Sequence, residues 1–309
     1  MKKLLLILSF LAMTACDPAP SVKPGYILTG IRPLNLKADP VEAVPGDTVV
    51  FSLFLGGRDF FQDSALPVKW FGAEALTLSY GQPFLFKIPE NIEEFLANPE
   101  IPSYVSESFE KNGFADLPVI ASFEEQIEEN GRSRTITLTK TLRIYKSLPE
   151  SGVNVNPVIS NVEAAYLING SVEKIEIKNS DNISFSLKEM PNTIGFKSVP
   201  DEATGYDRIN YRWYYTSDTG SILNEDIDIK EDLTDLEDFV PEGEKVTPNR
   251  QYFGADFTRI LEEIKTENKK LPVTFNFYNV IRDRATAAES SADYRWGSDH
   301  MWFTIEITE

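Results

Sequence analysis

The chain is poor in the residues on which the commonest enzymes depend. Its 309 residues include one cysteine and one histidine, which excludes a disulfide framework and leaves almost no material for a zinc site or a nucleophilic triad. Basic residues are also scarce, since 30 Lys and Arg stand against 48 Asp and Glu, giving a formal net charge of -18. A phosphate backbone repels such a chain, and no basic run offsets the repulsion, so we expect no nucleic-acid partner. Gly-rich phosphate loops, nucleophile elbows and His-rich metal motifs are missing as well. The sequence therefore predicts neither an enzyme nor a cofactor.

The N-terminus has the pattern of an export signal. Two lysines precede an apolar stretch over residues 4–12, which is too short to cross a bilayer as a mature helix, and the tripeptide Met13-Thr14-Ala15 then leads to Cys16. This pattern resembles the signal of a bacterial lipoprotein, in which a large apolar residue and two small ones precede the acylated cysteine. The resemblance implies that residues 1–15 are removed and that Cys16 carries acyl chains such as palmitate, with the lipid bilayer as a partner. The alternative is an ordinary secretory signal with an incidental cysteine.

The residues after the cysteine predict a tether. Residues 16–25 contain three prolines and should form an extended segment, rising roughly 3.1 Å per residue, that holds the fold about 25 Å from the bilayer. Asp17 resembles the signal that retains lipoproteins on the inner membrane of enteric bacteria. Because that rule does not extend safely to other lineages, we expect a location in the cell envelope and leave open whether it is the inner or the outer membrane.

From Tyr26 onward the hydrophobic pattern is that of β-strands. Apolar and polar residues alternate with period two, which is typical of antiparallel sheets with one buried face. The clearest alternating runs are Val49–Leu55, Ile136–Ile144, Ile183–Leu187, Ile209–Tyr215 and Met301–Ile307. The predicted fold class is therefore mainly β.

The strand pattern occurs twice along the chain. Each half has a tryptophan strand, containing Trp70 or Trp213, and each later has a Leu-Pro-Val strand start. This order resembles the immunoglobulin-like sandwich, in which a tryptophan packs between the two sheets. The usual cysteine pair is absent, and we expect residues such as Phe51 and Ile120 at those core positions.

We therefore expect two tandem immunoglobulin-like β-sandwich domains with short helical insertions. The first should cover residues 26–146 and the second residues 157–309, with the polar segment 147–156 as a linker. The openings at residues 26–33 and 44–49 resemble those of uncharacterised two-domain envelope lipoproteins of myxobacteria and related predatory bacteria. That resemblance implies an acylated protein with tandem modules.

Three segments interrupt the strand pattern with helical spacing. Apolar residues recur at three- and four-residue intervals over Gly254–Asn268, which predicts an amphipathic helix, and Asn91–Ala97 and Tyr104–Lys111 could be shorter counterparts. Each precedes a Leu-Pro-Val strand. We expect these helices to cap the ends of the sandwiches rather than to bind a partner.

The segment Asn224–Glu244 carries ten acidic residues and one lysine. Its acidic spacing partly fits a calcium-binding loop, with these weak candidate ligands: Asp226, Asp228, Asp232 and Glu237. Lys230 stands at the fifth position of such a loop, which needs a ligand, and Glu231 stands at the sixth, which needs a glycine for the sharp turn. We therefore expect a solvated loop and no metal site.

The connection before the last strand carries the aromatic and guanidinium groups that are enriched at interfaces. The candidate binding residues are Arg282, Arg284, Tyr294, Arg295 and Trp296. Alternatively, the aromatic residues complete the core. We expect His300, which follows this segment, to lie at the surface or at the base of a hairpin.

Together these features predict a membrane-anchored cell-envelope lipoprotein that is not an enzyme. It would bind or scaffold an unknown envelope protein through its immunoglobulin-like domains. The alternative is a lipid-anchored glycan-binding module, and a carboxylate-dependent glycosidase is a weaker alternative because the sequence has no cleft signature.

Overall fold

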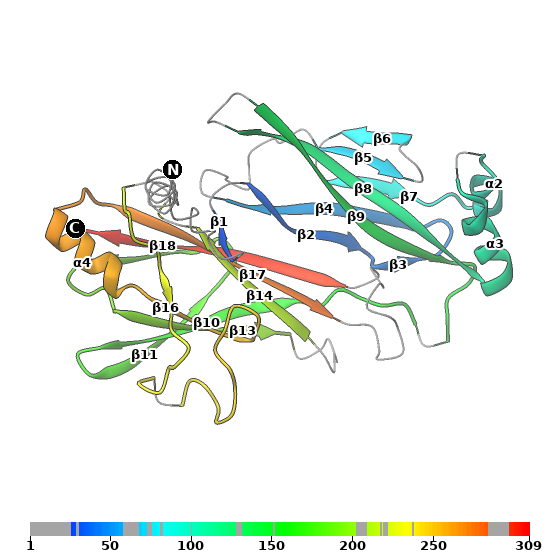
Figure 1. Cartoon of the computed structure of the whole chain (residues 1–309). Helices are drawn as coiled ribbons and strands as arrows, with labels where there is room; N and C mark the ends of the chain where they lie inside the picture. Colours follow the sequence, from blue (N-terminus) through cyan, green and yellow to red (C-terminus); the bar gives the residue numbers. More distant parts are fainter. Residues whose placement is uncertain are drawn as a thin grey trace, which may run out of the picture.

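The computed structural model shows a mainly β protein with short helices (Figure 1). It describes residues 26–28, 31–57, 68–72, 76–80, 83–99, 101–127, 132–150, 152–201, 209–216, 218, 222–236, 238–283 and 297–309. Within these ranges, no helix is long and apolar enough to cross a membrane.

Two sheets enclose the first hydrophobic core. One has the strand order β2 (Arg32–Asp39), β4 (Thr48–Gly56) and β7 (Phe84–Lys87). The other has the order β3 (Glu42–Ala43), β9 (Arg132–Tyr145), β8 (Phe114–Ile127), β5 (Lys69–Gly72) and β6 (Leu76–Tyr80). Their facing apolar side chains form one core whose buried members lie between Leu36 and Ile144. This half is therefore β-sandwich-like.

Two further sheets enclose the second core. The first has the order β1 (Ile27–Leu28), β14 (Ile209–Thr216), β17 (Val273–Asp283), β18 (Ser298–Thr308) and β12 (Asn182–Ser186). The second has the order β11 (Ser171–Ile177), β10 (Ile159–Ile168), β13 (Thr193–Pro200), β16 (Tyr252–Asp256) and β15 (Asp228–Ile229). The buried members of this core lie between Val162 and Ile307.

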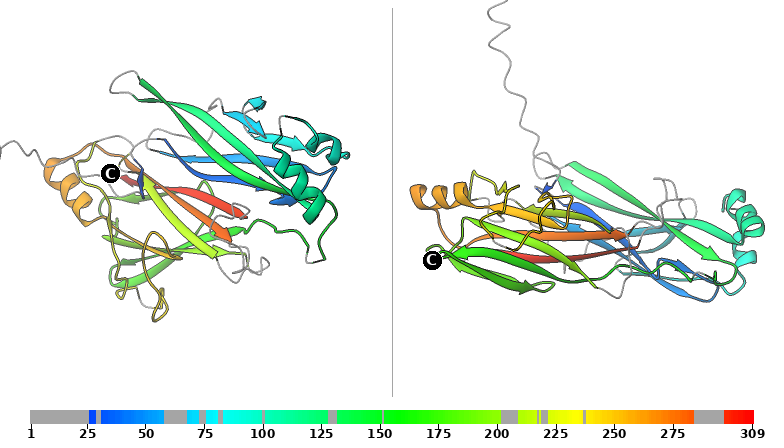
Figure 2. Two further views of the ribbon diagram at one scale, coloured as in Figure 1. Left: turned by 45° about the vertical axis from the view of Figure 1, so that its right-hand side comes forward. Right: turned by 90° about the horizontal axis from the view of Figure 1, so that it is seen from below.

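The helices lie at the ends of the molecule. Figure 1 and Figure 2 show α2 (Ile92–Leu96) and α3 (Ser103–Asn112) together at one end and α4 (Thr258–Glu267) at the other. The apolar face of α4 is buried in the second core through Ile260, Leu261 and Ile264. The helices therefore cover sandwich ends, as the amphipathic pattern indicated.

The alternating runs predicted the strands well. All five runs coincide with strands, namely β4, β9, β12, β14 and β18, although Leu187, the last residue of one run, falls just outside β12. The expected helix over Gly254–Asn268 begins later, at Thr258, because Tyr252–Asp256 pairs with β13 as strand β16. The five-residue strand β16 leads almost directly into α4. The alternation of the strand and the helical spacing that follows it were therefore read together as one helix.

Both tryptophans are core residues. Trp70 is 0% exposed and Trp213 is 1% exposed. Phe51 is also buried and lies beside Trp70, with 6.2 Å between the ring centroids. Ile120 differs from the expectation, since it is half-buried while its neighbours Val119 and Ala121 point into the core. The period-two register of β8 therefore places Ile120 on the opposite face.

The first strand does not belong to the first half. Ile27 and Leu28 pair in parallel with Tyr215 and Thr216 of β14, so β1 is an edge strand of the second sandwich. The sequence interpretation, which began the first half at residue 26, differs from this arrangement. The first strand of the chain, β1, belongs to the second half, and the next strand, β2, belongs to the first half. The two halves therefore do not follow one another as two separate stretches of sequence.

The two halves also share a third, smaller core. Its buried members are Leu28, Leu34, Phe54, Tyr278 and Val280. Alternate residues of β17 point to different cores, since Phe275 and Phe277 lie in the second core and Tyr278 and Val280 in this one. β17, for which the sequence predicted only a strand start, is therefore covered on both faces.

Candidate functional site

The site of interest is the junction between the two halves, where β2 and β4 of the first half face β17 and β18 of the second (Figure 1). Gly56 allows the close approach. A Cβ atom at this position would lie 2.6 Å from Leu34 Cδ1 and 2.8 Å from Leu28 Cδ1. The hydroxyl of Tyr278 accepts a hydrogen bond from the Gly57 amide at 3.3 Å across the same contact. The absence of a side chain at Gly56 therefore lets the apolar surfaces meet.

Polar groups continue the junction beside the apolar core. Lys37 Nζ donates to Asp299 at 3.0 Å. The ring of His300 stacks on Phe54 with 3.8 Å between centroids, and Asn35 Nδ2 lies 3.4 Å from His300 Nδ1. Each of these contacts joins the first half to the second.

His300 is therefore not a surface residue; it is the third residue of β18, near the connected end of the β17–β18 pair, and its ring faces the junction. Burial in the junction lowers the pKa of His300 to about 4, and the nearby Lys37 charge acts in the same direction while Asp299 opposes it. The imidazole is consequently neutral at pH 7. It acts as a packed, hydrogen-bonded ring rather than as a charge.

The segment predicted as a linker is fastened to both halves. The Asn154 amide donates to Glu42 at 2.8 Å, and Asn156 donates through Nδ2 to the Ala38 carbonyl at 2.8 Å. On the other side, Asn156 Oδ1 accepts from the Ser298 amide at 2.9 Å. The side chain of Asn156 thus connects β2 to the start of β18.

Arg282 is the one candidate binding residue that lies within the described part of the chain. Its guanidinium donates to the Leu34 carbonyl at 2.9 Å, so it reaches from β17 across the junction to β2. Burial lowers its pKa, and the charge of Arg212 lowers it further. The other four candidates, together with Cys16 and the leader, lie outside the described residues. These four are Arg284, Tyr294, Arg295 and Trp296.

Arg282 lines two cavities. The smaller, of about 250 Å³, lies between β2, β9, β17 and β18 and combines leucine side chains with Lys140, Arg282 and Ser298. Lys140 is 7% exposed, and burial lowers its pKa to about 8. The buried hydroxyl of Ser298 has no hydrogen-bond partner among the described residues.

A buried carboxyl lies beside this cavity. Asp283 is 1% exposed, and its Oδ1 atom has no hydrogen-bond partner within the described ranges. Burial raises the pKa of Asp283 to about 6, although the Lys140 charge and hydrogen bonding oppose the shift. This acid and this lysine therefore lie close enough to affect each other's protonation.

The second cavity at Arg282 has a volume of about 450 Å³ and a basic lining. Its lining includes Tyr26, Arg32, Arg212, Tyr214, Asn249 and Arg282, beside the buried Trp213. Arg32 comes from β2 of the first half, whereas Arg212 and Arg282 come from β14 and β17. The cavity therefore has lining residues from both halves, and its volume is within the usual range of small-ligand sites.

The acidic segment is not the solvated loop that its charge predicted. Leu233, Leu236 and Phe239 are buried with Tyr252 in an additional apolar cluster. A Cβ atom at Gly195 would lie 2.9 Å from Leu236 Cδ1 and from Phe239 Cε1. The segment therefore packs its apolar residues closely against the sheet, and mainly its carboxylates remain at the surface.

Two of the weak calcium candidates have partners within the protein. Asp228 pairs with Arg259, which also pairs with Glu225. Asp232 instead accepts a hydrogen bond from the Thr234 amide at 2.9 Å, which lowers its pKa. Glu237 lies outside the described residues. In the described part of the chain, no group of three His, Cys, Asp or Glu could hold a metal ion.

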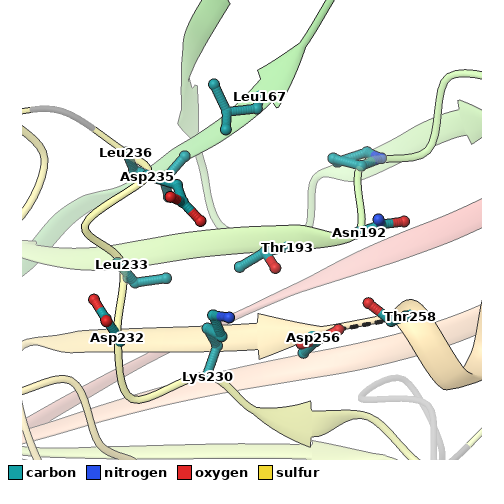
Figure 3. A pocket seen from close by; sticks show the side chains of 11 residues that line it. Leu167, Asn192, Thr193, Lys230, Asp232, Leu233, Asp235, Leu236, Asp256 and Thr258 are labelled. Carbon is teal, nitrogen blue, oxygen red and sulfur yellow. Dashed lines mark hydrogen bonds between the residues drawn. The ribbon is translucent and has the colours of Figure 1, made fainter. Parts of the chain in front are cut away.

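A third cavity, of about 350 Å³, lies beside the acidic segment (Figure 3). It brings together carboxylates from two elements, Asp232 and Asp235 of the segment and Asp256 at the end of β16, with Lys230 and Leu167. Asp256 accepts a hydrogen bond from the Thr258 amide at 2.9 Å, which fixes it at the start of α4. This cavity offers hydrogen-bond acceptors beside a small apolar wall.

Sequence reasoning missed Arg32, Arg212 and Lys140. One signal could have indicated Arg212, because it interrupts an apolar strand on the face that Trp213 and Tyr215 do not use. The pairing of β14 with β17, which brings Arg212 near Arg282, could not be read from spacing. No protein-family model matches the chain, and no curated protein matches it significantly.

Proposed function

We propose that the protein is a membrane-anchored cell-envelope lipoprotein that binds a ligand or partner at the junction of two immunoglobulin-like sandwiches and is not an enzyme. The observation that carries this proposal is the position of Arg282. This residue, predicted from the sequence as a contact residue, lines two cavities between the halves. The paired sheets and the buried tryptophans are consistent with immunoglobulin-like modules.

A preformed site supports binding. Gly56, the Phe54 stack and the Lys37–Asp299 pair hold the halves in one arrangement. The cavities at Arg282 therefore need no closing motion to form. Such preorganisation lowers the entropic cost of binding.

The anchor is tested by metabolic labelling. Cells supplied with labelled palmitate should incorporate it into the wild-type chain and not into Cys16→Ser, and that variant should lose its lipid attachment to the membrane fraction. Incorporation into Cys16→Ser would refute acylation at this residue.

The binding site is tested by co-purification from the envelope. The double variant Arg32→Gln, Arg212→Gln changes two side chains of the basic cavity that are both exposed, so the fold should be retained. Lys146→Gln is the control, because it removes an exposed cation that pairs with Glu93 of α2, away from the junction. The double variant should lose a bound component that the control retains. Equal recovery with all three chains would contradict binding at the junction.

The cavity of Figure 3 favours the glycan-binding alternative. Carboxylates accept hydrogen bonds from sugar hydroxyls, and Asp232, Asp235 and Asp256 gather around one hollow. Under this alternative, Asp235→Asn should weaken retention on a polysaccharide matrix, whereas Asp238→Asn, outside the cavity lining, should not. Identical retention of both variants would reject the alternative.

A further inference from the structure

Lys140 stands in a row of apolar residues that point into the protein. On the same side of β9, Leu138 packs against the first core and Leu142 lies within it, and the residue directly opposite Lys140 in β8 is the buried Val119. Lysine is rarely buried, because its ammonium group loses hydration there. An aliphatic residue would fill this place in the row without that cost, so the amine itself calls for an explanation.

The charges around Lys140 leave part of its amine neutral. Burial lowers its pKa to about 8, and the charge of Arg282 acts in the same direction, while the opposing charge of Asp283 does not cancel the shift. At pH 7 the amine is therefore neutral in about one molecule in ten, against about one in three thousand for a lysine with the ordinary pKa of 10.5. Only the neutral amine is a nucleophile, and desolvation is a recognised way of activating a lysine.

This lysine lines the cavity of about 250 Å³ at the junction, which has room for a small molecule. Leucine side chains from β2 and β9 form an apolar wall, namely Leu34, Leu36 and Leu138. Ser298 lines the same cavity from β18, and its buried hydroxyl has no hydrogen-bond partner among the described residues. Folded proteins seldom leave a buried hydroxyl unsatisfied, so a ligand oxygen beside Ser298 would supply a missing partner.

We propose that Lys140 binds small apolar aldehydes covalently, as an imine, in this cavity. The inference rests on the proposed function in taking the junction as the ligand site, and it adds a ligand class. The nitrogen of the neutral amine attacks the carbonyl carbon, and the carbon–oxygen double bond opens to give a carbinolamine. The carbinolamine then loses its oxygen, which leaves as water with the two hydrogens of the amine while the carbon–nitrogen double bond forms. The step needs no oxidant, reductant or further reactant.

The lining of the cavity favours a neutral carbonyl compound with a short apolar chain. The leucine wall provides apolar surface for the chain. The hydroxyl of Ser298 can donate a hydrogen bond to the oxygen on which negative charge develops as the amine attacks. Asp283 adds a negative charge close enough to act on Lys140, so an anionic ligand would gain little here.

The test uses the full chain in a detergent with uncharged headgroups, with butanal as the probe. Sodium cyanoborohydride reduces each imine to a stable butylamine, and peptide mass spectrometry measures the rate of labelling at every lysine. Labelling at Lys140 should be at least about tenfold faster than at Lys69, which is exposed on β5, and should saturate with butanal concentration. Added 1-butanol, which fits the cavity but forms no imine, should slow labelling at Lys140 and leave Lys69 unchanged. Ser298→Ala should lower the rate at Lys140 at least about threefold and not the rate at Lys69.

Labelling at Lys140 that is no faster than at Lys69, or that rises with butanal concentration without saturating, would overturn the covalent site. If the envelope component of the co-purification experiment is nevertheless lost in the Arg32→Gln, Arg212→Gln variant, the proposed function stands and only the aldehyde ligand is wrong. Fast, saturable labelling of Lys140 with equal recovery in the co-purification experiment has the opposite meaning. It would establish the covalent site and reject a partner at the basic cavity.

Discussion

Protonation of His300 should weaken the contact between the two halves. In the folded protein its pKa is lowered from 6.5 to about 4, because burial against Phe54 disfavours the imidazolium and Lys37 repels it. The unfolded chain binds the proton at its ordinary pKa. The His300 contribution to stability is therefore fully present above pH 6.5 and is lost as the pH falls toward 4.

The size of the effect follows from the two pKa values. A group with a pKa of about 4 when folded and 6.5 when unfolded loses roughly 2 kcal/mol of stability between pH 7 and pH 5. Asp283 changes stability in the opposite direction over part of this range, because its folded pKa is raised to about 6. The effect of His300 must therefore be measured as a difference from a variant that lacks only this titration.

His300→Phe is that variant, because it keeps a ring against Phe54 and has no proton to gain. Urea unfolding of both chains at intervals from pH 7.5 to pH 4.5 gives the free energy of unfolding of each. The difference between the chains should shift by about 2 kcal/mol in favour of the variant as the pH falls from 7 to 5. Parallel stability curves would show that His300 is solvated and that the junction is not packed as described.

Four further substitutions test the cores and the junction. Trp70→Ala and Trp213→Ala should each cost ~3 to 5 kcal/mol of unfolding free energy in urea titrations, since both side chains are fully buried, and unchanged midpoints would reject their core positions. Gly56→Ala should cost about 1 to 3 kcal/mol in the same assay, because its Cβ would meet Leu28 and Leu34, and a neutral result would mean that the halves do not approach closely here. Asp283→Asn should gain stability relative to the wild type by up to about 3 kcal/mol between pH 4 and pH 7, because the wild type must ionise a buried carboxyl, and pH-independent differences would refute the raised pKa.

The strands could be predicted because alternation reflects a sandwich directly. In β18 the alternate residues Met301, Phe303, Ile305 and Ile307 enter the core, as the pattern indicated. The opposite face could not be assigned in the same way. His300 and Trp302 lie on this opposite side of β18 and pack against the first half. Because a solvent-exposed strand can also carry a histidine or a tryptophan, the sequence does not show that this side is covered.

The candidate site was predicted only through Arg282. Its type and its place near the end of a strand indicated a contact residue, but its neighbours in the cavity come from β2 and β14, which are distant in the sequence. The acidic segment was predicted wrongly for a different reason. Its charge predicted a solvated loop, whereas three apolar residues among the carboxylates decide its packing.

Photo-crosslinking in living cells tests the binding claim most directly. The photoreactive residue p-benzoylphenylalanine is introduced at Tyr214, which lines the basic cavity, and separately at Tyr104, which is 63% exposed on α3. After irradiation, mass spectrometry of the recovered chain should show an envelope component attached at position 214 and none at position 104. Attachment at position 104 alone, or at neither position, would contradict binding at the junction.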